Sequence, residues 1–171
     1  MARLLALLAW LLVASGALAE PLSTASAVAG FPSNNPDQQP EVALIATVSF
    51  IDPSGTIFLE DETGATFLNS TPNPSQYQAG QVLEIKGVRI PGLYIGGIRA
   101  RSITVLSDGP PPPPITPDLK ELRSGRFHYR RVRLEGNVHR ARATGDTAAT
   151  LRLHVQGGLL SVRITDHLPD P

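Results

Sequence analysis

The chain of 171 residues contains no cysteine. This absence excludes disulfide bonds, zinc sites with cysteine ligands, and catalysis by a thiol. It also excludes a lipid-modified cysteine at an N-terminal cleavage point. Aromatic residues make up only 5% of the chain, so large rings contribute little to any core.

The chain as a whole has no excess of positive or negative charge, because the formal net charge is zero. Residues 20–118 nevertheless contain four Lys/Arg and ten Asp/Glu, whereas residues 119–171 contain ten and five. The acidic half argues against a nucleic-acid partner. The arginines of the basic half mostly alternate with apolar residues, which is typical of the solvated face of a sheet, with an anionic partner as the alternative.

Only one apolar run is long, from Leu4 to Val13. It follows Arg3 and precedes a small-x-small site at Ala17-Leu18-Ala19, so residues 1–19 are predicted to be a signal peptide cleaved before Glu20. The alternative is an uncleaved membrane anchor, but the run is shorter than the ~20 residues of a membrane span. We therefore expect an extracytoplasmic protein, either periplasmic or secreted.

Proline and glycine are abundant, with 16 and 15 residues, and this favours short strands and turns over long helices. Residues 20–41 have turn formers without periodicity and are predicted to be a flexible linker. Residues 108–118 include Pro110 to Pro114 and are predicted to be a stiff polyproline spacer.

Residues 42–107 are predicted to form five short strands closed into a small all-β Greek-key barrel. Two hairpin turns separate the first three strands, and Gly87 marks a bulge in the fourth. The alternation predicts that Phe50 lies on the same side of the first strand as Ala46 and Val48, and that Val105 is buried in the fifth.

Residues 119–171 are predicted to be a partial second copy of this unit. A helical turn at 118–122 precedes a strand at 132–138 and a hairpin at 150–155 and 159–164. Two strands of the five have no residues to form them. Either the hairpin completes itself on the first copy or the chain is a fragment, and we expect a fragment.

Four segments carry a resemblance: TVSFIDPSGTIFLEDETGATFLN, AGQVLEIKGVRI, IRARSITVLSDGPPPPP and ELRSGRFHYRRVRLEGNVHRA. Across residues 42–171 the chain resembles the tandem oligonucleotide-binding (OB)-like extracytoplasmic region of bacterial membrane-bound sensor proteins. In that family a transmembrane helix and a histidine kinase or diguanylate cyclase output module follow. The resemblance implies a sensing role. The chain departs from the family in its incomplete second module and in lacking the helix and the output module.

No pattern in the sequence points to catalysis, a cofactor or a metal site. Glu60, Asp61 and Glu62 gather carboxylates at a hairpin tip but lack the spacing of a calcium loop, so a hydrated turn is favoured. The four histidines have no metal-ligand spacing, and no nucleophile elbow is present.

The best candidates for ligand contact are Tyr94, in a glycine-flanked loop, with the neighbouring Arg99 and Arg101. Phe58 and Phe67 lie on the strands with which OB barrels bind ligands, but we interpret them as core.

The sequence therefore predicts a non-enzymatic ligand- or partner-sensing β-barrel region of a bacterial membrane sensor. The alternative is a free-standing periplasmic or secreted OB-like protein that binds a small molecule, an oligosaccharide or a protein surface. In either case the partner is an unidentified small ligand or protein. Membrane attachment would require a C-terminal segment absent from this sequence or an uncleaved signal.

Overall fold

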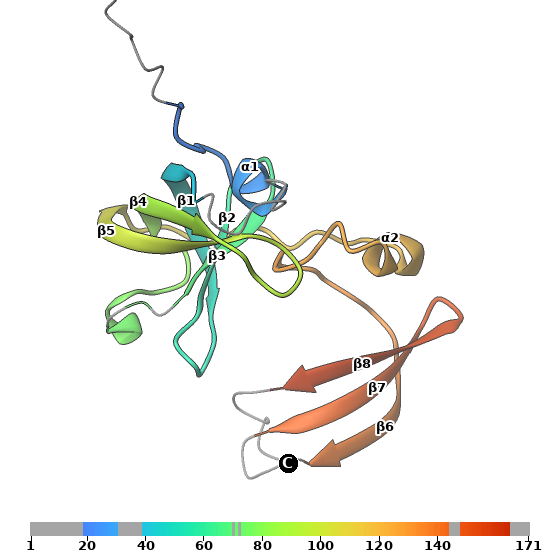
Figure 1. The fold of residues 1–171 in the computed structure, drawn as a ribbon. Helices are drawn as coiled ribbons and strands as arrows, with labels where there is room; N and C mark the ends of the chain where they lie inside the picture. The colour runs from blue at the N-terminus through green and yellow to red at the C-terminus, as the bar shows by residue number, and fades with distance from the viewer. Residues whose placement is uncertain (1–18, 31–38, 70, 72, 144–147, 165–171) are drawn as a thin grey trace, which may run out of the picture.

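The computed structural model describes residues 19–30, 39–69, 71, 73–143 and 148–164 of the chain (Figure 1). The predicted signal peptide falls almost wholly outside these residues. Two groups of strands account for most of the described secondary structure. The elements are α1 (Ala25–Gly30), β1 (Glu41–Ile51), β2 (Ile57–Glu60), β3 (Ala65–Leu68), the 3₁₀ turn η1 (Pro74–Gln76), β4 (Val82–Ile90), β5 (Gly97–Ser107), α2 (Leu119–Arg123), β6 (Asn137–Ala143), β7 (Ala149–Val155) and β8 (Gly158–Ile164).

Strands β1 to β5 form a closed barrel in the order β1-β2-β3-β5-β4. Strand β1 pairs antiparallel with both β2 and β4, so it closes the barrel, and β3 meets β5 in a short parallel contact at Leu68 and Ile98. The predicted all-β class and the closed five-stranded barrel are confirmed. Each of these five strands therefore has two neighbours in the barrel, although β3 and β5 pair only at Leu68 and Ile98.

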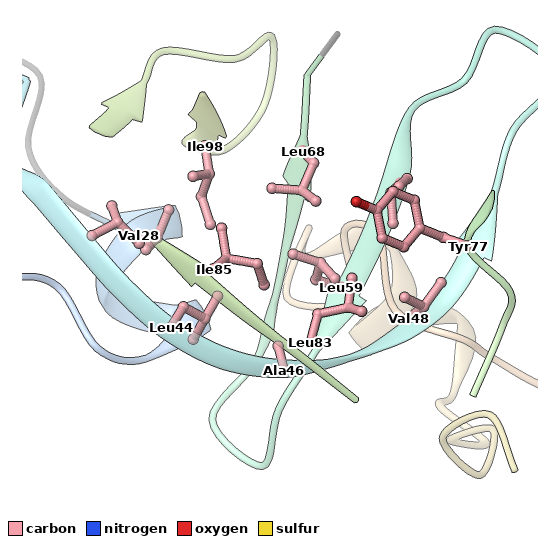
Figure 2. Packing of buried hydrophobic residues seen from close by; sticks show 12 residues of the cluster. Val28, Leu44, Ala46, Val48, Leu59, Leu68, Tyr77, Leu83, Ile85 and Ile98 are labelled. Atoms are coloured by element: carbon pink, nitrogen blue, oxygen red, sulfur yellow. The ribbon is translucent and has the colours of Figure 1, made fainter. Parts of the chain in front are cut away.

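The barrel interior is filled by aliphatic side chains that alternate along the strands (Figure 2). Leu44, Leu59 and Ile85 are completely buried, and Tyr77, which follows η1, covers one side of the same cluster. Burial of each aliphatic side chain is worth about 1.5–3 kcal/mol, so this cluster supplies the main stabilisation of the domain.

Two expectations from the alternation, that Phe50 shares a side with Val48 and that Val105 is buried, are wrong, and a β-bulge explains the first. The pairing of β1 with β2 shifts between Val48 and Phe50, so Val48 faces the interior and Phe50 turns outward with 46% of its surface exposed. Val105, near the end of β5, is 44% exposed rather than buried. The bulge predicted at Gly87 is confirmed by a register shift between Lys86 and Gly87.

The segment before β1 is not a flexible linker where the structure describes it. Leu22 forms a parallel bridge with Val42, and α1 packs on the barrel through Val28, which is completely buried beside Leu44 and Ile85 (Figure 2). The Arg89 Nε–H donates to the Val28 carbonyl oxygen at 3.3 Å. The buried residues of α1 are Ala25 and Val28, and two apolar residues three positions apart are too few to predict a helix of six residues. The remainder of the predicted linker, residues 31–38, lies outside the described residues.

The second half contains α2 and a separate antiparallel sheet in the order β6-β7-β8 (Figure 1). The predicted helical turn and the predicted hairpin are confirmed as α2 and as β7–β8. The predicted strand at 132–138 is wrong, because Val132 makes only an isolated bridge with Ile115 and β6 begins at Asn137. Among the described residues, no helix is long and apolar enough to cross a membrane.

Candidate ligand-binding site

A hollow of about 480 Å³ lies on the outer surface of β1 and β2, where the segment before β6 crosses the barrel. Its volume is within the range of small-molecule sites. Aromatic and cationic side chains dominate its lining, which consists of Ser49, Phe50, Asp52, Phe58, Tyr129, Arg130, Arg131 and Arg163.

The bulge in β1 builds one wall of this hollow. Because Phe50 is turned outward, it lies opposite Phe58 of β2 with the ring centroids 6.0 Å apart and the planes 22° from parallel. Ser49, at the bulge, is only 5% exposed, and its Oγ has no hydrogen-bond partner among the described residues. A buried hydroxyl without a partner is unfavourable, so a ligand atom that bonds to it would be stabilised.

Tyr129 supplies the second wall. Its ring lies 5.0 Å from that of Phe58 and 5.5 Å from that of Phe67, centroid to centroid, in tilted and edge-on arrangements that aromatic pairs favour. Its backbone has a φ of +63°, which a bulky residue adopts only when its surroundings hold it there. Burial raises the pKa of the Tyr129 hydroxyl, and Tyr94 raises it further.

Glu60 anchors the segment that carries Tyr129. Its carboxylate, at the end of β2, accepts the Arg131 backbone N–H at 2.6 Å and the Arg130 Nε–H at 3.3 Å. The Arg131 guanidinium in turn donates to the Pro112 carbonyl oxygen at 2.7 Å. The proline-rich segment and the Tyr129 segment are therefore fixed together on the outside of the barrel.

The three carboxylates at the β2–β3 turn do not act as a group. Glu60 is buried against the arginine segment, whereas Asp61 Oδ1 accepts the backbone N–H groups of Thr63 and Gly64 within the turn. Asp61 Oδ2 accepts the Ala25 backbone N–H at 2.7 Å and so caps the start of α1. Glu62 is exposed. Among the described residues, no group of His, Asp and Glu is close enough to hold a metal ion.

The structure separates the three predicted contact residues. Tyr94 is 63% exposed in the β4–β5 loop and stacks on His128 with centroids 4.8 Å apart, at the margin of the Tyr129 cluster. Arg101 is bound by both oxygens of the Glu41 carboxylate at 2.6 and 3.0 Å and lines a different hollow. Arg99 is exposed on β5.

Sequence reasoning missed the aromatic cluster itself. Phe58 and Phe67 lie directly opposite each other on β2 and β3, half-buried on the outer face, and are not part of the barrel core. The signal was present in β2, because Ile57 and Leu59 flank Phe58 and a strand cannot place three consecutive side chains on one face. No sequence pattern indicates that Tyr129 joins this cluster, since it contacts Phe58 and Phe67 only because the chain returns to the barrel after the proline-rich segment.

The chain matches no protein-family model and no curated protein. What can be inferred about its function therefore comes from its own residues and geometry.

Proposed function

We propose that the chain is a non-enzymatic extracytoplasmic binding module whose ligand occupies the aromatic hollow on β1 and β2. The observation that supports this most directly is the combination of outward-facing rings, Phe50, Phe58 and Tyr129, with a buried hydroxyl that has no partner among the described residues, at Ser49. Aromatic rings gathered around a surface hollow are typical of a site that binds a flat, apolar part of a ligand.

The charges around the hollow narrow the chemistry of the ligand. Arg130 is paired with Glu60, while Arg163 of β8 is exposed and also lines the hollow. A planar ring could stack on Phe58 or Tyr129 while an acidic substituent reached the Arg163 guanidinium. We therefore propose a small aromatic ligand that carries a negative group.

The strand order β1-β2-β3-β5-β4, with a parallel contact between β3 and β5, supports the proposal that the barrel is an OB-like Greek-key unit. The meander β6-β7-β8 has the same connectivity as β1-β2-β3, which supports the proposal of a partial second copy. Together with the predicted signal peptide, this arrangement favours a sensing region of a bacterial membrane sensor. The alternative remains a free-standing periplasmic or secreted binding protein.

The site is tested by titration with 8-anilinonaphthalene-1-sulfonate, a fluorescent aromatic anion, against the mature full chain. Wild type should give saturable 1:1 fluorescence enhancement, and Tyr129→Ala should weaken the affinity about tenfold or more, because a stacked ring contributes ~1–3 kcal/mol. Leu93→Ala is the matched control, since Leu93 is 83% exposed on the neighbouring loop. Equal affinity in wild type and Tyr129→Ala would refute the site, provided that circular dichroism shows both folded.

Sensor and free-standing protein are distinguished by the native product. Its intact mass is measured after membrane and periplasmic fractions are separated. A longer, membrane-bound product supports the sensor, and a soluble product that ends at Pro171 supports the alternative.

A further inference from the structure

One face of the β6–β8 sheet gathers arginine side chains and shares a single residue, Arg163, with the aromatic hollow. Residues opposite each other in an antiparallel pair share a face, so the pairing defines two rows. In one row Arg140, Arg152 and Ser161 are adjacent, and in the next Arg142, Thr150 and Arg163 are adjacent. The face is thus a grid of six polar side chains, of which four are arginines.

A bulge in β6 creates this grid. Simple alternation would place Val138 and Arg140 on the same side of the strand. The register shift between them instead pairs Val138 with Leu153 and Arg140 with Arg152. The shift therefore moves Val138 to the side of the leucines and brings Arg140 and Arg142 onto the side of Arg152.

Every side chain of the grid can donate a hydrogen bond, and none carries a negative charge. Within the residues that the structure describes, the four arginines make no ion pair and no side-chain hydrogen bond, and β6, β7 and β8 contain no Asp or Glu. Arg140 and Arg152 are directly opposite, an arrangement that is destabilising for like charges. An anion on this face would remove that repulsion.

Three of the four arginines line a space of molecular size. Arg140, Arg142, Thr150 and Arg152 line a hollow of about 300 Å³. Strands lie ~4.8 Å apart and residues i and i+2 on one strand ~6.7 Å apart, so the guanidinium groups are spaced for adjacent groups of one ligand. A guanidinium binds a phosphate through two parallel hydrogen bonds, and the three guanidinium groups at this hollow match an anion with several phosphate groups.

We propose that this arginine face binds a ligand that carries two or more adjacent phosphate groups. The arginine face shares Arg163 with the aromatic hollow, but Arg140, Arg142 and Arg152 line a different hollow, so the two proposals are tested by different variants. A nucleic acid read through its bases is disfavoured, because β6, β7 and β8 contain no Phe, Tyr or Trp on which successive bases could stack, and His154 is the one ring beside Arg152 on this face. The bisphosphate group could belong to a soluble molecule or to a lipid headgroup, and the experiment distinguishes these.

The test is isothermal titration of the full mature chain with sodium tripolyphosphate. Wild type is expected to bind one equivalent, with an affinity that falls as salt is raised. Arg140→Gln/Arg152→Gln should weaken binding at least about tenfold, because it removes two charge-assisted contacts. The matched control is Arg126→Gln/Arg133→Gln, which changes the net charge equally at exposed arginines outside the face and should stay within about twofold of wild type.

Folding is controlled by thermal unfolding without ligand. Removing the Arg140–Arg152 repulsion should leave the melting temperature unchanged or raise it, so a loss of binding cannot be attributed to unfolding. Tripolyphosphate should raise the melting temperature of wild type and of the control, and not that of Arg140→Gln/Arg152→Gln.

The source of the phosphates is identified by sedimentation with phosphatidylcholine vesicles that contain cardiolipin. If the protein sediments with the vesicles and tripolyphosphate releases it, the phosphates belong to a lipid headgroup. If the protein binds tripolyphosphate but does not sediment with the vesicles, the phosphates belong to a soluble molecule. Three results would overturn the proposal: no binding by wild type, an equal loss in the control variant, or equally tight binding of sulfate, which lacks adjacent anionic groups.

Discussion

Replacing Glu60 by alanine should detach the segment that forms one wall of the aromatic hollow. The Glu60 side chain is 2% exposed and accepts hydrogen bonds from the Arg131 backbone and the Arg130 side chain. A hydrogen bond to a charged group contributes about 1.5–3 kcal/mol. The Arg130 side chain is 22% exposed, so water can replace part of its interaction, whereas the Arg131 N–H loses its partner. We expect a destabilisation of about 2–4 kcal/mol.

The free energy of unfolding is measured by urea denaturation with circular dichroism. Glu62→Ala is the matched control, because Glu62 is exposed two residues further along, and it should change stability by less than ~0.5 kcal/mol. Glu60→Gln keeps an oxygen that can accept the Arg131 N–H and should cost about 1 kcal/mol.

Trypsin provides a local readout, since it cleaves after Arg130 and Arg131. Cleavage there should be faster in Glu60→Ala than in wild type because the segment opens without unfolding of the barrel. The reasoning would be refuted if Glu60→Ala matched Glu62→Ala in both stability and cleavage rate.

Three further predictions follow from the same contacts. Tyr94→Ala should weaken binding of the anilinonaphthalene probe without lowering the melting temperature, because Tyr94 stacks on His128 beside Tyr129; an unchanged affinity would show that Tyr94 does not contribute to the site. Asp61→Ala removes the cap of α1 and should cost ~1 kcal/mol in urea denaturation, and a smaller loss in Asp61→Asn, which keeps an acceptor, is the check. Tyr129 should titrate, by absorbance at 295 nm, above its ordinary pKa of about 10. A raised folded-state pKa on an acid favours the neutral form, so this stabilisation is complete below pH ~10 and is lost as the pH rises through the folded value. Tyr129→Phe should lack that alkaline loss.

The barrel could be predicted because its strands alternate cleanly between turns with a clear mechanism. The Leu44, Leu59 and Ile85 positions follow from period-two burial, and the Gly87 bulge follows from the glycine. The α1 helix could not be predicted, because its position depends on a distant carboxylate, Asp61, and on the burial of a single side chain, Val28. Local propensity is too weak to specify six residues of helix without such tertiary contacts.

The residues of the candidate site were harder to predict from the sequence than the fold was. Tyr94 was found because a loop tyrosine between glycines is exposed by default. Arg101 was chosen for its proximity in sequence, but the structure pairs it with Glu41, sixty residues away. Tyr129 and Arg163 reach the hollow from the second half of the chain, and only the three-dimensional path of the connecting segment brings them there.

One structural device creates both surfaces and explains why alternation failed at them. Each bulge lies in the first strand of a three-stranded meander, between Val48 and Phe50 in β1 and between Val138 and Arg140 in β6. One extra residue reverses the facing of all that follow in the strand. Without the first shift Phe50 would enter the core, and without the second Arg140 would lie among leucines. Neither of these two bulges has a glycine like the one that marks the bulge at Gly87, so period-two alternation gives no sign of them, and bulges commonly re-aim side chains at functional sites.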